Sequence, residues 1–283
     1  MAYVLSIAKK TAVITALVEG CSVRSTSRMT GVAKGTILRL LAEVGTACSE
    51  YQNRAIRNVS ARRVQVDEIW NFCYCKQKNM TPEIAEERIA GDVWTFTAID
   101  ADTKLVISWL VGRRDAGCAA EFLQDIAGRL SNRIQLTSDG HKMYLDAVEE
   151  AFGGDVDFAQ LVKIYGNSPE GQQRYSPAQW LGSKREYISG DPDPKHISTS
   201  YVERQNLNMR MGMRRFTRLT NAFSKKIDNL IHSVALFHMH YNFARVHQTL
   251  RVTPAMEAGL SSHVWSVQEI VALTIESQSR LAA

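Results

Sequence analysis

Residues 63–75 read RVQVDEIWNFCYC, and this run of apolar residues around one acidic pair indicates the fold class. Val, Ile, Trp, Phe and Tyr stand close together in it, which predicts a β-strand. Residues 92–112, DVWTFTAIDADTKLVISWLVG, predict two more strands joined by a turn at residues 100–103. A helix, a strand and a second helix are expected at residues 115–130, 133–140 and 142–152. Strands followed by helix, strand and helix predict an α/β fold with a mixed sheet flanked by helices.

The chain beyond residue 152 is less regular. Residues 153–198 are rich in glycine and proline, which predicts an irregular insertion between two core elements. Two long helices are expected after it, at residues 200–218 and about 221–244. A last short helix is expected at residues 265–273.

The N-terminal part predicts helices. Residues 22–45, SVRSTSRMTGVAKGTILRLLAEVG, indicate a helix, a turn at residues 30–32 and a second helix from about Ala33. This is the pattern of a helix-turn-helix that binds DNA, although a plain helical hairpin would give the same periodicity. The residues expected to contact DNA are Arg28, Lys34, Thr36 and Arg39.

The composition fits a globular protein. The chain has 283 residues, 45% hydrophobic and 22% charged, with 34 Lys and Arg against 29 Asp and Glu. Its five cysteines are scattered and give no disulfide framework, which indicates a reducing compartment. Cys73 and Cys75 lack the second pair that a zinc site needs, and we interpret them as core. We expect no membrane span and a cytoplasmic, nucleoid-associated location.

Three carboxylates occupy positions where acids are unusual. Asp67 lies inside an apolar strand, Asp139 lies at the end of a strand, and Glu203 lies in the first turn of a helix. Together they would suit Mg²⁺ or Mn²⁺, and two such ions could promote phosphodiester displacement. Each acid also has an ordinary explanation: an exposed edge strand for Asp67, an Asp-Gly turn for Asp139, and a Ser200–Glu203 capping box.

A basic segment follows Glu203. On one continuous helix, Asn206, Arg210 and Arg214 would lie on the face that carries Glu203, where they could hold the phosphate backbone of DNA. Arg215 and Arg218 add to this positive charge. A solvent-exposed basic face is the alternative.

The motifs DEIW (67–70), TSDG (137–140) and YVERQNLNMR (201–210) resemble those of IS1-family insertion-sequence transposases. Residues 240–259, HYNFARVHQTLRVTPAMEAG, resemble the C-terminal part of bacterial transposases. The resemblance covers roughly residues 60–273. It implies a ribonuclease H-like fold with a mixed five-stranded sheet, whose first and fourth strands carry the two aspartates. It also assigns Asp67, Asp139 and Glu203 as a catalytic triad that holds Mg²⁺ or Mn²⁺, with two ions expected.

The N-terminal pattern and the resemblance together predict the domain division, and the resemblance implies the function. The expected parts are a helix-turn-helix domain (1–52), a basic linker (53–63), a catalytic domain (64–250) with the insertion 153–198, and a tail (251–283). The reaction would be metal-dependent cutting and joining of double-stranded DNA at the inverted-repeat ends of an insertion sequence, by a dimer or larger homo-oligomer. The spacing from Asp139 to Glu203 is longer than in the best-known IS1 enzymes, and their N-terminal zinc-finger cysteines are missing. The alternatives are a DNA-binding regulator that does not cut, or a ribonuclease H-like nuclease unrelated to transposition.

Overall fold

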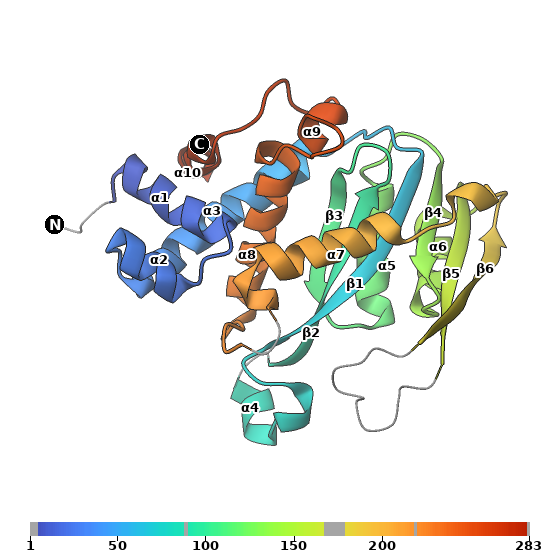
Figure 1. Ribbon diagram of the computed structural model, residues 1–283, viewed down its shortest axis with the longest axis horizontal. Helices are drawn as coiled ribbons and strands as arrows, with labels where there is room; N and C mark the ends of the chain where they lie inside the picture. The colour runs from blue at the N-terminus through green and yellow to red at the C-terminus, as the bar shows by residue number, and fades with distance from the viewer. Residues whose placement is uncertain (1–4, 88–89, 167–178, 218–219, 282–283) are drawn as a thin grey trace.

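The computed structural model describes residues 5–87, 90–166, 179–217 and 220–281. It has a mixed α/β architecture, in which helices cover a six-stranded sheet (Figure 1). The strands are β1 (Arg63–Cys73), β2 (Gly91–Asp100), β3 (Val106–Gly112), β4 (Ile134–Asp139), β5 (Val156–Tyr165) and β6 (Trp180–Ser189). Among these residues no helix combines the length and the apolar composition that crossing a bilayer requires.

The strands lie in the order β3-β2-β1-β4-β5-β6. β1 pairs with β4 in parallel, and β4 pairs with β5 in parallel. The β1–β2, β2–β3 and β5–β6 pairs are antiparallel. The sheet is therefore mixed, as the sequence predicts, but it has one strand more than the five expected.

The sixth strand belongs to the segment that was expected to be irregular. The prediction of an irregular insertion at residues 153–198 is wrong, because this segment supplies both β5 and β6. Val156, Phe158 and Ala159 of β5 are buried in the sheet. Gly153, Gly154, Gly190, Pro192 and Pro194 lie outside the strands, whereas Gly182 lies within β6, next to a shift in its register with β5.

The helices follow the predicted order, with different ends in the C-terminal part. They are α1 (Ile7–Val18), α2 (Val23–Thr30), α3 (Lys34–Ala55), α4 (Pro82–Glu87), α5 (Ala116–Ala127), α6 (Met143–Phe152), α7 (Ser200–Gly212), α8 (Ile227–Met239), α9 (Pro254–Glu257) and α10 (Val267–Leu281). Short 3₁₀ turns occur at Gln77–Asn79, Pro194–His196 and Arg214–Phe216, and a π-helical turn at His240–Ala244 follows α8. The predicted helix 200–218 is wrong beyond Gly212, because Met213 adopts an extended backbone.

The two faces of the sheet bury different clusters. Val64 and Val66 of β1 belong to the cluster that includes Phe122 of α5 and Tyr144 of α6. Residues Ile69 and Cys73 of β1 lie in another cluster with α7 and α8, which contribute Met209, Leu230 and Val234. Because successive side chains of a strand point to opposite faces, α7 and α8 cover the face opposite α5 and α6. The expected core position of Cys73 is confirmed, whereas Cys75 lies beyond the end of β1 and is only partly buried.

The N-terminal helices pack against the same core. The turn from α2 to α3 contains Gly31, whose positive φ of 70° ends α2. α3 crosses α8 at Gly45, where an added Cβ would lie 2.5 Å from the Cβ of His232. One continuous hydrophobic cluster includes Val13 of α1, Ile37 of α3 and Ile270 of α10 together with the sheet residues. The proposed domain division therefore does not correspond to separate hydrophobic cores.

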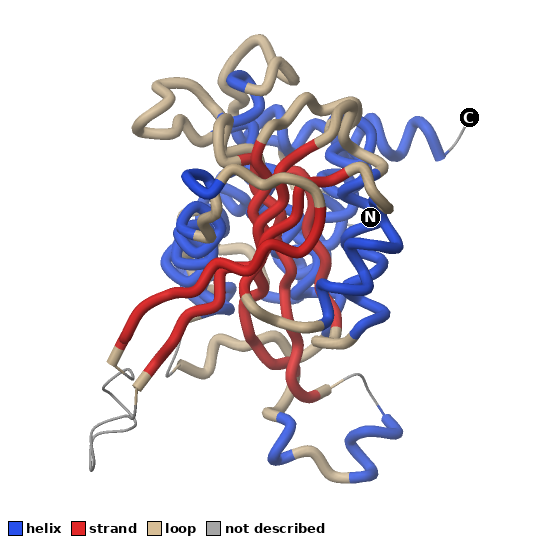
Figure 2. Tube along the Cα trace, turned by 90° about the vertical axis from the view of Figure 1, so that its right-hand side faces the viewer, coloured by secondary structure: helices blue, strands red, loops and turns tan. Residues whose placement is uncertain are grey.

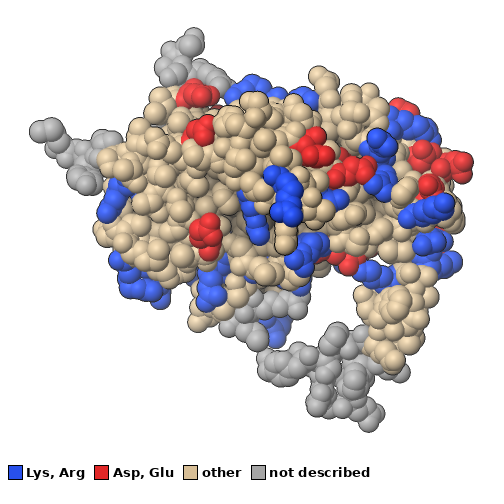
Figure 3. Space-filling view, turned by 45° about the horizontal axis from the view of Figure 1, so that its top comes forward, with Lys and Arg blue, Asp and Glu red and all other residues tan. Residues whose placement is uncertain are grey.

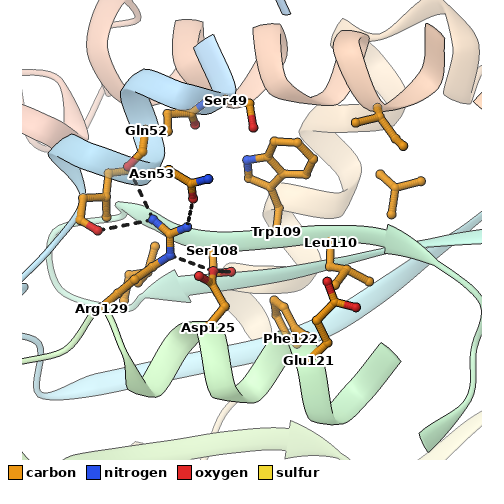
Figure 4. A pocket seen from close by; sticks show the side chains of 14 residues that line it. Ser49, Gln52, Asn53, Ser108, Trp109, Leu110, Glu121, Phe122, Asp125 and Arg129 are labelled. Atoms are coloured by element: carbon orange, nitrogen blue, oxygen red, sulfur yellow. Dashed lines mark hydrogen bonds and ion pairs between the residues drawn. The ribbon is translucent and has the colours of Figure 1, made fainter. Parts of the chain in front are cut away.

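A buried arginine connects α3 to α5 (Figure 4). The side chain of Arg129 follows α5, is 7% exposed, and forms a 2.7 Å ion pair with Asp125. Its guanidinium also donates to the carbonyl oxygens of Gln52 and Ile56, 3.4 and 3.3 Å away, near the C-terminal end of α3. The Gln52 carbonyl also accepts the backbone N–H of Ile56, so Arg129 adds a second donor there, and it supplies a donor to the Ile56 carbonyl at the end of the helix. It lines a pocket of about 430 Å³ between α3, β3 and α5.

Candidate active site

Asp67 and Asp139 project from the same face of neighbouring strands. In the parallel β1–β4 pair, Gln65 lies opposite Thr137. Asp67 and Asp139 each stand two residues further along their strands, and side chains two apart share a face. Asp139 is the last residue of β4. A triad requires the two aspartates to lie on one face of the sheet. Asp67 and Asp139 do so.

Glu203 reaches this face from α7, which lies across β1 (Figure 1). The start of α7 is fixed by β1, because the side-chain oxygen of Gln65 accepts hydrogen bonds from the backbone N–H groups of Tyr201 and Val202, at 2.8 and 3.2 Å. The N-cap is Thr199, and its hydroxyl donates to the carboxylate of Glu203. The Ser200–Glu203 capping box does not form, because Ser200 already lies inside the helix.

The three acids line one pocket of about 450 Å³, which also contains His141, Lys163 and Tyr165. The side chains of Asp139 and Glu203 are 38% and 39% exposed, whereas Asp67 is more deeply placed. Residues from β1, β4 and α7, far apart in the sequence, are thus brought to a single solvent-accessible site.

Asp67 lies in an unfavourable environment for a negative charge. Burial raises its pKa to about 7, and the neighbouring acids Glu68, Asp139 and Glu203 raise it as well. The backbone N–H of Glu68 opposes this by donating to its carboxylate at 2.8 Å. The side-chain amide of Asn206 donates to the other oxygen at 2.9 Å. A bound cation would relieve the crowding of negative charge.

Two basic residues that sequence analysis missed lie against these acids. Lys163 of β5 forms an ion pair with Glu203. Arg114, just after β3, lies 2.5 Å from Glu68 and 3.9 Å from Asp139, and its guanidinium lies over the ring of Trp94. The signal that could have revealed Lys163 is its place on β5, two residues after the partner of Asp139.

Glu68 itself was also missed as a site residue. It faces the opposite side of β1 from Asp67, and its side chain is completely buried. The hydroxyl of Tyr144 in α6 donates to Glu68 at 2.7 Å, so Glu68 has partners on both sides. Because Arg114 contacts Glu68 and Asp139 together, it joins this buried acid to the pocket.

The site provides the right donor atoms for a hard divalent cation, because three carboxylates face one space. Within the described residues, however, no group of three or more His, Cys, Asp or Glu side chains surrounds a common point closely enough to hold a metal ion. Lys163 and Arg114 lie against two of the three carboxylates instead. The three carboxylates are suitable ligands for Mg²⁺ or Mn²⁺. They would have to move closer together to bind such an ion.

The residues expected to contact DNA fall into two groups. On α2 and α3, Arg28, Lys34 and Arg39 are exposed and Thr36 is half-buried. On the face shown in Figure 3, Lys and Arg side chains are spread over the surface with Asp and Glu between them. The distribution of charge in this view does not single out one basic patch.

The second group, after Glu203, differs from the prediction. Asn206 is buried against Asp67, so it contacts a carboxylate on the protein. Arg210 is half-buried on α7, whereas Arg214 is exposed but lies beyond the end of that helix. The single stripe expected through residue 214 is therefore wrong.

Arg215 and Arg218 complete this group. The guanidinium of Arg215 donates to the hydroxyl of Ser224 at 2.7 Å, and burial lowers its pKa to about 10. Arg215 thus has a partner within the fold. Arg218 lies outside the described residues.

Comparisons with known proteins do not assign the chain to a family. No protein-family model matches the chain, and no curated protein matches it. Among solved structures, the chain is similar to one described as the strand transfer complex of Mos1, with 10% identity over 83% of this chain and 75% of that one. The TM-score is 0.25, which is too low to establish a shared fold.

Proposed function

We propose that the chain is a DNA transposase with an Asp-Asp-Glu active site, of the type seen in the IS1 family that its motifs resemble. The observation that carries this proposal is that Asp67, Asp139 and Glu203 line one pocket although they come from three distant parts of the chain. The substrate would be double-stranded DNA at the inverted-repeat ends of an insertion sequence.

The topology supports a ribonuclease H-like arrangement. In the order β3-β2-β1-β4-β5, β2 is antiparallel to its neighbours and the β1–β4 and β4–β5 pairs are parallel. β6 would be an addition at the edge of that sheet. The α2–α3 unit, with its three-residue turn and exposed Lys34 and Arg39, would be the helix-turn-helix that reads the element ends.

In this proposal, Asp67, Asp139 and Glu203 would hold two Mg²⁺ or Mn²⁺ ions. Bound there, such ions supply activation of a water or hydroxyl and stabilisation of the leaving oxygen. Asn206 fixes the orientation of Asp67 through its 2.9 Å hydrogen bond. Lys163 must release Glu203 before that carboxylate can bind a cation. The exposed arginines would position the DNA through its phosphates.

One observation favours a second candidate, a protein that binds DNA without cutting it. Glu203 is paired with Lys163, and Asp139 has Arg114 nearby, so the protein itself provides positive charge for both acids. In a protein that no longer binds metal, these basic side chains would stabilise the two carboxylates in its place.

Incubation of the protein with Mn²⁺ and DNA carrying the candidate ends distinguishes these functions. The transposase is expected to cut at the ends and to join the freed 3′-hydroxyl to target DNA. Binding of the same DNA with no cutting or joining, at any concentration of Mn²⁺ or Mg²⁺, would reject the catalytic proposal and leave the second candidate.

A further inference from the structure

The β5–β6 hairpin forms an arm, here defined as residues 161–165 of β5 and 180–187 of β6. Figure 2 shows the two strands leaving the body of the sheet together. The arm exposes large side chains that would normally be buried: Tyr165 is 55% exposed, Trp180 62% and Tyr187 55%. Three exposed aromatic side chains on one hairpin indicate a binding surface.

These aromatic residues lie on one face of the arm. Tyr165 pairs directly with Trp180, and Ala159 pairs with Tyr187. Residues 159, 161, 163 and 165 share a face of β5, so their partners on β6 share it too. Arg185, which pairs with Leu161, therefore lies on this face between the aromatic side chains. This face therefore combines three aromatic side chains with the basic side chains of Lys163 and Arg185.

This face is continuous with the acidic pocket. Lys163 and Tyr165 both line the pocket that contains Asp67, Asp139 and Glu203. A chain of nucleotides lying on the arm would thus lead directly to the three carboxylates. The opposite face carries Val162, Ile164 and Lys184 and does not share this arrangement.

We propose that this face of the arm binds unpaired nucleotides of the DNA end, with bases stacked on Trp180 and Tyr165 and phosphates held by Arg185. This proposal rests on the proposed function, and it specifies that the DNA end enters the pocket as a single strand. Every base has a flat face that can stack on an aromatic ring, and basic side chains between the rings suit the phosphates of a single strand. A paired duplex does not offer its base faces to such a surface.

A second copy of the chain is a less suitable occupant. β6 is the edge strand of the sheet, where another strand could add. The middle of β6 carries Lys184, Arg185 and Glu186, and charges on an edge strand disfavour pairing with another copy. Positive charge among the aromatic rings instead complements a polyanion.

Fluorescence anisotropy without metal tests this proposal with three labelled DNAs: a blunt duplex, the same duplex with a single-stranded thymidine tail, and that duplex with an abasic tail. Wild type is expected to bind the thymidine tail about 5- to 150-fold more tightly than the abasic tail, because stacking on one aromatic residue has that range of effect. Trp180→Ala should reduce this difference about 5-fold or more, because only Tyr165 then remains to stack a base. Trp180→Phe should retain most of it.

Ile164→Ala is the matched control, because Ile164 is 47% exposed on the other face of the same arm. It should bind all three DNAs as wild type does. The proposal is overturned if Trp180→Ala and Ile164→Ala have the same effect. It is also overturned if Trp180→Ala instead dissociates a protein dimer in sedimentation without DNA.

The wild-type controls separate this inference from the function on which it rests. Salt-dependent binding of the blunt duplex with no preference between the two tails overturns the role of the arm and leaves the proposed function standing. Failure to bind any of the three DNAs overturns both.

Discussion

Asn206 changes its role between sequence and structure. Helical spacing places it on the same side of α7 as Glu203, which predicts a DNA contact. In the structure it is buried and donates to Asp67, so it positions a carboxylate. The sequence could not reveal this, because the strand that carries Asp67 is far away in the chain. Lys163 and Arg114 were missed for the same reason.

We expect Asn206→Ala to reduce DNA cleavage about 10- to 100-fold, which is the usual effect of removing the hydrogen bond that orients a metal-binding side chain. DNA affinity and its salt dependence should stay unchanged, because the side chain is buried. Cleavage rates and anisotropy titrations at several salt concentrations measure both. If Asn206→Ala bound DNA more weakly and its affinity depended less on salt, Asn206 would contact DNA after all.

His238 provides a residue-scale prediction about stability. It is fully buried beside Trp109 and Phe237, and burial lowers its pKa to about 3. Below about pH 6.5 the unfolded chain takes up a proton that the folded protein does not, so stability falls as the pH falls. From pH 7 to pH 5 this loss is about 2 kcal/mol.

Urea unfolding of wild type and His238→Phe at the two pH values measures this effect. Wild type is expected to lose about 2 kcal/mol more than the variant between pH 7 and pH 5. Equal losses would mean that the folded protein protonates His238 as readily as the unfolded chain does.

At the scale of the element, most helices and strands follow from local pattern. The strands β1 to β4 and the helices α2, α3, α5 and α6 lie where apolar periodicity and turn residues predict them. β5 and β6 were not predicted, because the many glycine and proline residues at 153–198 indicated an irregular segment. The end of α7 at Gly212 was missed because the basic residues continue past it. The cap of α7 by Gln65 depends on a tertiary contact that no local pattern contains.

The end of α7 separates two arginines that the sequence treats alike. Arg214 is exposed, whereas Arg215 donates to Ser224. We expect Arg214→Ala to weaken binding to any duplex and to reduce the slope of log affinity against log salt by about 1. Arg215→Ala should instead lower the free energy of unfolding by about 1.5–3 kcal/mol, since it removes a charged hydrogen bond.

Duplex titrations at several salt concentrations and urea unfolding, applied to both variants, test this division. If Arg214→Ala binds DNA with the wild-type slope, the segment after α7 does not hold the phosphate backbone. If Arg215→Ala unfolds as wild type does, its contact with Ser224 contributes nothing to the fold.

At the scale of the whole molecule, the N-terminal helices and the sheet share one core, and Arg129 connects α3 to α5, which packs on the sheet. Arg129→Met would leave Asp125 and two carbonyls without this donor. We expect it to lower the free energy of unfolding by about 1.5–3 kcal/mol, the range for hydrogen bonds made by a charged group, because Arg129 is buried although Asp125 is partly exposed. Arg133→Met is the control, because its ion pair with Asp157 is at the surface and should contribute much less to the free energy of unfolding.

Urea unfolding followed by fluorescence and by circular dichroism measures both effects. The two probes should give one coincident transition for wild type, because the helices and the sheet unfold together. Separate transitions, with the earlier one alone affected by Arg129→Met, would show that the N-terminal helices are an independent domain.

The central claim is that Asp67, Asp139 and Glu203 bind divalent metal, and calorimetric titration with Mn²⁺ in the absence of DNA tests it most directly. Wild type should bind Mn²⁺, and Asp139→Asn should lose that binding. Lys163→Met should bind about fivefold more tightly, since an exposed ion pair contributes up to about 1 kcal/mol and would no longer compete for Glu203. Mn²⁺ binding by Asp139→Asn with the wild-type affinity would contradict the account.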